Sequence, residues 1–240
     1  MKSNSSPPVF SRNRISNPYM KSQSDIREVL AFLRELAANN DRTWFKANKD
    51  RYDALRGPWE RDMERLIALV AQFDDNVSGL ALKDSVYRIY RDIRFSNDKS
   101  PYKRYFSGVL GKGGRHTIIS SYYVHFEPDN LMLGGGVWWP EKTILEQLRL
   151  LIDAEPEEFL KIVRNREFTR RYSWECATLK KIPAGFDPQS PVADFLKMKE
   201  YIVMMRPDES YFDCEDWVER VAADLKPMKP LHDFLNYVFD

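Results

Sequence analysis

The chain is long enough to build one sizeable hydrophobic core. Of its 240 residues, 43% are hydrophobic, 13% aromatic and 30% charged. Thirty-seven Lys and Arg residues stand against 36 Asp and Glu residues, so the net charge is +1 and no global field favours nucleic acid or an anionic membrane. Any basic surface must therefore be local, and we expect one folded domain.

Cysteine usage and apolar runs narrow the cellular setting. Cys176 and Cys214 are too few for a disulfide scaffold and lack the paired spacing of a zinc site. The longest apolar runs, such as residues 148–152, are far shorter than the roughly 20 residues that span a bilayer, and the N-terminus has no apolar signal core. These features predict a cytoplasmic protein with no membrane partner.

The N-terminal third divides into a tail and a run of helices. Residues 1–23 are rich in Ser, Asn and Pro without apolar periodicity, which predicts a disordered tail before a single domain over residues 24–240. Asp25 and Glu28 have capping-box spacing ahead of a helix that ends near Asn39. A second helix should end at Gly57-Pro58, and a third should follow from Trp59 to Phe73.

The middle of the chain favours strands. Residues 86–95 are rich in β-branched and aromatic side chains and should form a strand, followed by a loop that carries Lys99 and by a second strand up to Leu110. Residues 120–127 alternate, with Tyr122 on one face and His125 on the other, and should pair with residues 131–138 in a hairpin.

The C-terminal half favours helices around one more strand. Helices are expected from Pro140 and Pro156 and over residues 194–199, 216–225 and 230–239, with a strand over residues 201–205. The whole is typical of the α+β class, with a mostly antiparallel central sheet and helices at the N- and C-terminal ends.

The best candidate site is the segment 85–105, where cations alternate with aromatic rings. Guanidinium and ammonium groups beside rings are suited to binding phosphate or carboxylate oxygens and to stacking on a flat ligand. An ion-pair lattice with Asp84, Asp92 and carboxylates of flanking helices would explain the same residues. The side chains assigned to ligand binding here are Arg88, Arg91, Arg94, Lys99, Tyr102 and Lys103.

Two residues of the predicted hairpin are candidates for catalysis. His125 and Glu127 are two apart on a strand, so their side chains point the same way and could transfer protons. A structural, hydrogen-bonded histidine is the alternative. His116 and His232 show no ligand spacing with His125, so we expect no metal site and assign no cofactor.

Three successive glycines, Gly134 to Gly136, stand in the second strand of this hairpin. Their missing side chains indicate a bulge, or a ligand or aromatic ring lying against the backbone. Gly135 and Trp138 therefore join the predicted ligand-binding residues. Trp138 and Trp139 alternate faces, which places one in the core and the other beside the site.

Four motifs in order resemble a bacterial family. They are NNDRTWF from residue 39 with Asn48-Lys49, YRIYRDIRFS from residue 87 with DKSPYK from residue 98, YYVHFEP from residue 122, and GGGVW from residue 134. The chain is similar over about residues 25–238 to the bacterial domain-of-unknown-function family 2461, also described as a conserved hypothetical protein. The resemblance implies one cytoplasmic α+β domain and transfers no catalytic role to any residue.

Three functions follow from these patterns. The leading one is binding of an anionic, planar or phosphorylated small molecule by the cations of residues 85–105. The second is an enzyme that hydrolyses or transfers a phosphoryl-type group, with His125 or Glu127 as the general acid or base. The third, which the neutral net charge disfavours, is a module that contacts nucleic acid or protein through these cations and the basic residues of the tail.

Overall fold

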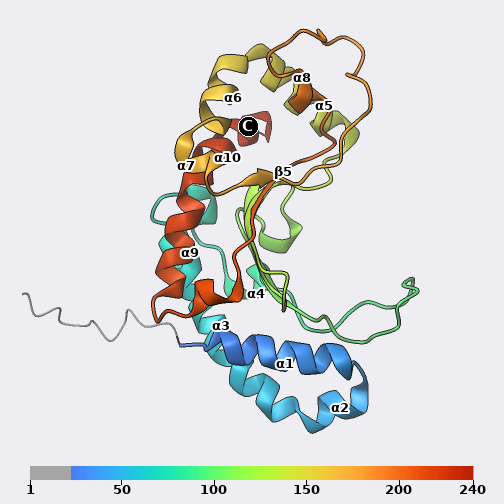
Figure 1. The fold of residues 1–240 in the computed structure, drawn as a ribbon, viewed down its shortest axis with the longest axis vertical. Coiled ribbons are helices and arrows are strands. Elements are labelled where there is room, and N and C mark those ends of the chain that lie inside the picture. Colours follow the sequence, from blue (N-terminus) through green and yellow to red (C-terminus); the bar gives the residue numbers. More distant parts are fainter. Residues whose placement is uncertain (1–22, 240) are drawn as a thin grey trace, which may run out of the picture.

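A computed structural model describes residues 23–239 as helices arranged around one antiparallel sheet (Figure 1). The predicted tail lies outside the described residues except for Gln23. The backbone N–H groups of Gln23 and Ser24 donate to the carboxylate of Asp62, which joins the start of the described chain to the longest helix. The predicted α+β class with a mostly antiparallel sheet is confirmed.

The first helix forms as the sequence predicts. In α1 (Ile26–Ala38), the side chain of Asp25 accepts hydrogen bonds from the N–H groups of Arg27 and Glu28, and the apolar positions are buried. A short helix, α2 (Arg42–Ala47), follows with Asp41 as its N-cap.

The predicted helix break at Gly57-Pro58 is wrong. The helix α3 (Lys49–Val70) continues through both residues. Tyr52, Trp59 and Met63 lie on its buried face on both sides of the proline. A proline inside a helix removes one backbone hydrogen bond, and we infer that burial of this continuous apolar face outweighs that loss.

Residues 87–105 form no regular strand, so the strand predicted over residues 86–95 is wrong. The loop around Lys99 is as predicted, and the second predicted strand forms only at its end, over residues 106–110. After α4 (Leu82–Ser85) residues 87–105 leave the body as a two-limbed projection, here called the arm (Figure 1). Its limbs pair only at isolated points, such as the bridge between Tyr90 and Tyr102 and the hydrogen bond from Lys103 N–H to the carbonyl of Ile89. Phe95 in the turn is 96% exposed, so no buried face holds a strand there.

The sheet contains five strands in the order β1-β2-β3-β5-β4, and all neighbours are antiparallel. The predicted hairpin is confirmed as the pair β2 and β3, with Tyr122 opposite Gly135 and Tyr123 opposite Gly134. The strands are β1 (Phe106–Leu110), β2 (Ser121–Phe126), β3 (Met132–Val137), β4 (Ser173–Trp174) and β5 (Tyr201–Met205).

The remaining helices gather around one end and one face of the sheet. They are α5 (Lys142–Ala154), α6 (Pro156–Val163), α7 (Arg166–Thr169), α8 (Ala193–Leu196), α9 (Trp217–Leu225) and α10 (Lys229–Asn236). The predicted positions of α5, α6, α9, α10 and β5 are close to the observed ones. No helix among residues 23–239 is both long and apolar enough to span a membrane.

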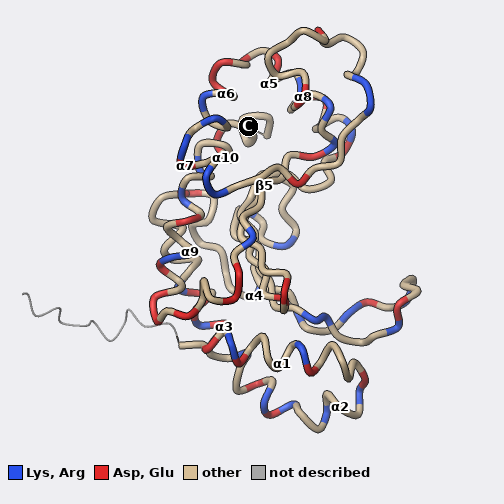
Figure 2. Tube along the Cα trace, viewed as in Figure 1, with Lys and Arg blue, Asp and Glu red and all other residues tan. Residues whose placement is uncertain are grey.

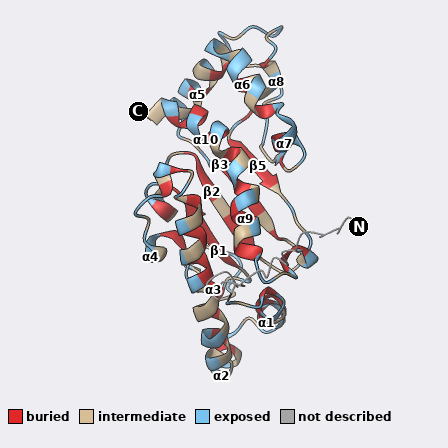
Figure 3. Ribbon diagram, turned by 90° about the vertical axis from the view of Figure 1, so that its left-hand side faces the viewer, coloured by how far each residue is buried: buried red, intermediate tan, exposed pale blue. Residues whose placement is uncertain are grey.

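One face of the sheet packs against α3 and α9, which lie side by side across it (Figure 3). Phe126 on β2 makes edge contacts with Trp59 of α3 and with Trp217 of α9, and all three side chains are buried. Tyr122 and Val124 share this inner face, so Tyr123 and His125 point to the opposite, outer face.

Neighbouring strands account for the three glycines. A Cβ atom on Gly135 would lie 2.2 Å from the carbonyl oxygen of Ser121, and one on Gly136 would lie 1.9 Å from that of Tyr201. Gly136 also has a φ of 135°. The close approach expected at these residues is therefore made by the backbones of β2 and β5.

Candidate functional site

The tip of the arm is largely neutralised by its own carboxylates. Arg91 donates to Asp98, with 2.5 Å between the nitrogen and the oxygen, and also to the carbonyl of Ser100. Arg94 binds Asp92 through both its Nε and Nη2 atoms. Lys and Arg thus lie beside Asp along this trace (Figure 2), and the lattice interpretation describes the tip well.

The pKa values at the tip follow from these pairs. Hydrogen bonds from Arg94 lower the pKa of the Asp92 carboxyl to about 2. Hydrogen bonds from Ser100, and then from Arg91, hold the pKa of Asp98 well below its usual range. Both carboxylates are charged at neutral pH, so Arg91 and Arg94 have internal partners.

The base of the arm is different, because the ammonium of Lys103 has no carboxylate beside it. Lys103 donates to the carbonyl of Arg88, and its ammonium lies 4.8 Å from the centre of the Tyr87 ring. Arg115 lies 5.9 Å from the same ring and donates to the carbonyls of Lys83 and Asp84. The side chain of Arg88 donates no hydrogen bond to residues 23–239, although its charge acts on the carboxylate of Asp92. We call Arg88, Lys103 and Arg115 the basic cluster.

Lys103 carries the electrostatic signature of this cluster. Its side chain is half-buried, and burial lowers the pKa of the ammonium to about 8, with Arg88, Arg115 and Arg56 acting in the same direction. No carboxylate contributes in the opposite direction. The Lys103 ammonium is therefore surrounded by positive charges and has no counter-ion. An anion from solution could serve as that counter-ion.

A hydrogen-bonded chain crosses the outer face of the sheet beside the cluster. The hydroxyl of Tyr123 lies 2.8 Å from Nδ1 of His125, and Nε2 of His125 lies 3.3 Å from the carboxylate of Glu127. Asn130 donates to the same carboxylate at 2.6 Å, and an Arg104 nitrogen lies 3.7 Å from its second oxygen. Each end of the imidazole is therefore engaged.

The proton positions in this chain follow from the charges. Because Glu127 accepts, Nε2 of His125 carries the proton, and Nδ1 accepts from the hydroxyl of Tyr123. Burial lowers the pKa of His125, and Glu127 only partly offsets it. Burial also raises the pKa of Tyr123, although the Ser107 hydroxyl acts in the opposite direction. The arrangement can relay a proton between Tyr123 and Glu127, and the catalytic role of His125 and Glu127 stays a prediction.

Aromatic rings continue from the base of the arm across the outer face. The ring centres are 4.4 Å apart for Tyr105 and His125, 5.7 Å for His125 and Tyr123, and 5.5 Å for Tyr123 and Trp138. Trp139 lies 6.1 Å beyond Trp138. We call these five side chains the aromatic row. Trp138 and Trp139 are 36% and 82% exposed, so the prediction that one of them is in the core is wrong.

The other predicted ligand-binding residues are placed apart from the cluster. Tyr102 is buried and its ring stacks on Phe45 with 4.0 Å between centres. Lys99 donates to the carbonyl of Ile93 near the tip. Gly135 lies inside the sheet. The structure therefore brings Arg88, Lys103 and Trp138 to one side of the molecule, while the ligand-binding roles of the whole set stay predictions.

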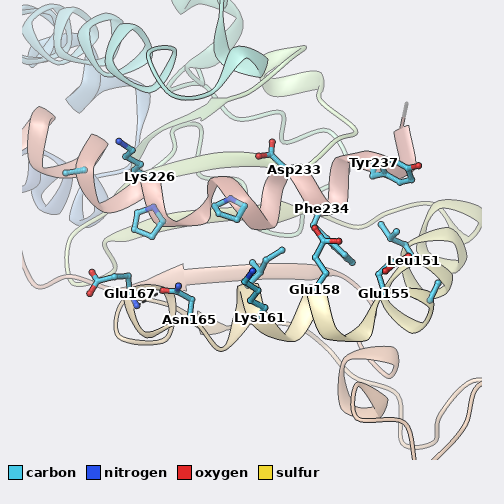
Figure 4. Close-up of a pocket in the computed structure, with 15 residues that line it drawn as sticks. Leu151, Glu155, Glu158, Lys161, Asn165, Glu167, Lys226, Asp233, Phe234 and Tyr237 are labelled. Carbon is cyan, nitrogen blue, oxygen red and sulfur yellow. Dashed lines mark hydrogen bonds between the residues drawn. The ribbon is translucent and has the colours of Figure 1, made fainter.

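A large hollow lies elsewhere on the molecule. It is a groove of about 1180 Å³ between α6 and α10 with an apolar floor that includes Leu151, Ile162 and Phe234 (Figure 4). Two carboxylates on its rim, Glu167 and Asp233, are already paired with basic side chains. None of the predicted site residues lines it.

The remaining candidates for chemistry among the described residues are clusters of metal ligands and the two cysteines. Residues 23–239 contain no group of three His, Cys, Asp or Glu side chains placed to hold a metal ion. Cys176 and Cys214 are free thiols, and burial raises the pKa of both, which makes them poor nucleophiles at neutral pH.

Four residues of this region were absent from the predicted ligand-binding set. Tyr87 and Tyr105 belong to the segment 85–105, whose rings the sequence shows. Tyr123 lies on the same strand face as His125, so the alternation of this strand could have indicated it. Arg115 follows a glycine-rich turn more than twenty residues away in sequence, and no local pattern connects it to Tyr87.

One family model matches the chain. It is described as Conserved hypothetical protein (DUF2461), and the match covers residues 28–234. The searches of curated proteins and of solved structures returned no match.

Proposed function

Because the chain belongs to the family described as Conserved hypothetical protein (DUF2461), a description that names no activity, we propose a function from the geometry alone. The protein binds an anionic small molecule that bears a phosphate or carboxylate group. The anion lies on the basic cluster at the base of the arm, against the rings of Tyr87 and Tyr105.

The environment of Lys103 is the single observation that carries this proposal. Its ammonium is half-buried, its pKa is lowered by burial and by three guanidinium groups, and no carboxylate compensates. Keeping such a charge uncompensated costs stability, and a bound anion would remove that cost. Arg88 and Arg115 could add charge-assisted hydrogen bonds to the same oxygens.

Binding is favoured over catalysis because of how His125 is held. Its side chain is 5% exposed, and both ring nitrogens are engaged by Tyr123 and Glu127. A general acid or base must reach the proton that it transfers.

The free cysteines fit a reducing compartment, so we place the protein in the cytoplasm.

Calorimetric titration of the intact protein with inorganic phosphate at low ionic strength tests the proposal. We expect saturable binding that becomes roughly ten- to hundredfold weaker in Lys103→Met, since a hydrogen bond to a charged group contributes about 1.5–3 kcal/mol. The melting temperature without phosphate should not fall in this variant. The substitution removes an ammonium whose charged form is disfavoured by burial and by the neighbouring cations.

Two variants serve as controls for this titration. Lys46→Met removes an exposed lysine on α2 and should leave phosphate binding unchanged. Arg94→Ala removes a cation that is already bound to Asp92 and should also bind phosphate like the wild type. Phosphate binding that is equal in the wild type and in Lys103→Met, or absent from both, would contradict the proposal.

A further inference from the structure

The aromatic row begins at the basic cluster, and its two ends are chemically different. At one end, the ammonium of Lys103 lies 6.0 Å from the ring centre of Tyr105. At the other end stand the two tryptophans, of which Trp139 is largely exposed. Positive charge at one end and exposed indole rings at the other fit a ligand that joins a phosphate to a flat ring.

The middle of the row connects these two ends without a gap. Tyr105 contacts His125, His125 contacts Tyr123, and the ring of Tyr123 contacts Trp138. The hydrogen bonds of His125 to Tyr123 and Glu127 fix the central rings on the sheet. The cations and the indoles therefore stand at fixed positions on the sheet, with the rings of Tyr105, His125 and Tyr123 between them.

The backbone of Trp139 adds an independent observation. Its φ is 41°, in the left-handed region that bulky residues rarely adopt. Its N–H donates to the carboxylate of Glu200, and its side chain stands in solvent instead of packing. Backbone strain of this kind is typical of sites that bind a ligand. An indole that remains exposed on a strained backbone is suited to stacking on a ligand.

We propose that the ligand is a short single-stranded oligonucleotide, with one phosphate on the basic cluster and the base of another nucleotide of the same strand on Trp138 and Trp139. This inference rests on the proposed function and names the chemistry of its ligand. Aromatic side chains stack on every base because every base has a π face. Phosphate supplies the negative charge that Lys103 lacks.

The test titrates the intact protein with ribose 5-phosphate, adenosine monophosphate and a short oligothymidylate, followed by tryptophan fluorescence and calorimetry. We expect the oligothymidylate to bind roughly 5- to 150-fold more tightly than ribose 5-phosphate, as a stacked base does elsewhere. Adenosine monophosphate should lack most of this gain, because one nucleotide is too short to reach from the basic cluster to the indoles. Trp139→Gly should abolish this difference and leave ribose 5-phosphate binding unchanged. Glycine suits the φ of 41°, so the variant should fold.

Tyr237→Ala is the matched control, because Tyr237 is 71% exposed and lines the groove between α6 and α10. It should leave all three affinities unchanged. An advantage of the oligothymidylate over both other probes supports the inference if Trp139→Gly removes it, and an equal advantage of adenosine monophosphate would contradict the inference.

The two proposals fail in different ways. If the bases add no affinity, or if Trp139→Gly keeps their advantage, the nucleotide inference is overturned while binding of ribose 5-phosphate that depends on Lys103 still supports the proposed function. If the base-bearing probes bind through Trp139 but Lys103→Met changes nothing, both the placement of the phosphate and the proposed function are overturned.

Discussion

His232 is a buried titratable side chain that the candidate site does not use. It lies on α10 with 1% exposure, its Nδ1 is 2.6 Å from the hydroxyl of Ser120, and its ring centre is 4.2 Å from that of Tyr122. Its Nε2 has no hydrogen-bond partner among residues 23–239. Burial, helped by Lys229, lowers its pKa to about 3. The neutral imidazole is therefore part of the fold.

This lowered pKa predicts a specific loss of stability in acid. Between about pH 6.5 and pH 3 the unfolded chain binds a proton at this histidine that the folded chain does not, so stability rises with pH across that window and falls on acidification. In His232→Gln the pH dependence of the unfolding free energy should decrease by about 1.4 kcal/mol per pH unit there. Urea unfolding at several pH values measures it.

The exposed His116 provides the control for the acid experiment. His116→Gln makes the same substitution at an exposed histidine and is the matched control. Carboxylates contribute equally to all three proteins, so the comparison isolates the histidine. Identical slopes in the wild type and His232→Gln would mean that His232 is protonated within the folded protein.

At the scale of elements, local signals predicted the regular structure where packing and propensity agree. The cap at Asp25 and the alternation around Tyr122 led to α1 and β2 almost at their observed bounds. Propensity alone misled at residues 86–95, because a β-rich sequence forms a strand only where a neighbour and a buried face are available. The limbs of the arm bridge only at isolated points, and no side chain over residues 91–101 is buried.

Gly57 in α3 provides a test of the helix that the sequence did not predict. A Cβ atom there would meet only the tip of Arg61, at 3.5 Å, so alanine should fit. Since glycine costs roughly 0.5–1 kcal/mol relative to alanine inside a helix, Gly57→Ala should stabilise the protein by about that amount in urea unfolding. Destabilisation would indicate that the helix does break here.

Gly136 is the opposite case and serves as the control. Its φ of 135° and the carbonyl of Tyr201 leave no room for a Cβ atom. Gly136→Ala should therefore lower stability, although the substitution is the same. The contrast separates helix propensity from a general effect of added methyl groups.

At the scale of the molecule, the sequence shows which charged and aromatic residues are present but not which of them the fold brings together. The concentration of cations over residues 85–105 is visible in the sequence, but the division into a neutralised tip and an uncompensated base depends on where Asp92 and Asp98 fall relative to the arm. The contribution of Arg115 depends on a loop packing against Tyr87. Long-range contacts of this kind leave no local pattern.

Phe126 connects the sheet to the helix layer and tests whether residues 24–240 behave as the single domain that we predict. Its ring contacts Trp59, Phe212 and Trp217, with centres 5.9, 5.2 and 5.6 Å away, and it is fully buried. Phe126→Ala should cost about 3–5 kcal/mol, as large-to-small changes in a core do. If the core is one unit, far-ultraviolet circular dichroism and tryptophan fluorescence should report the same shifted urea transition.

Phe95→Ala is the matched substitution outside the core. Phe95 is 96% exposed at the tip of the arm, so its loss should change stability by no more than about 0.5 kcal/mol. Separate transitions from the two probes in Phe126→Ala would instead show that the helices around α5 and α6 unfold independently of the layer formed by α3 and α9. Coincident transitions are expected because β3 and β5 run from one region into the other and share a continuous hydrogen-bonded ladder.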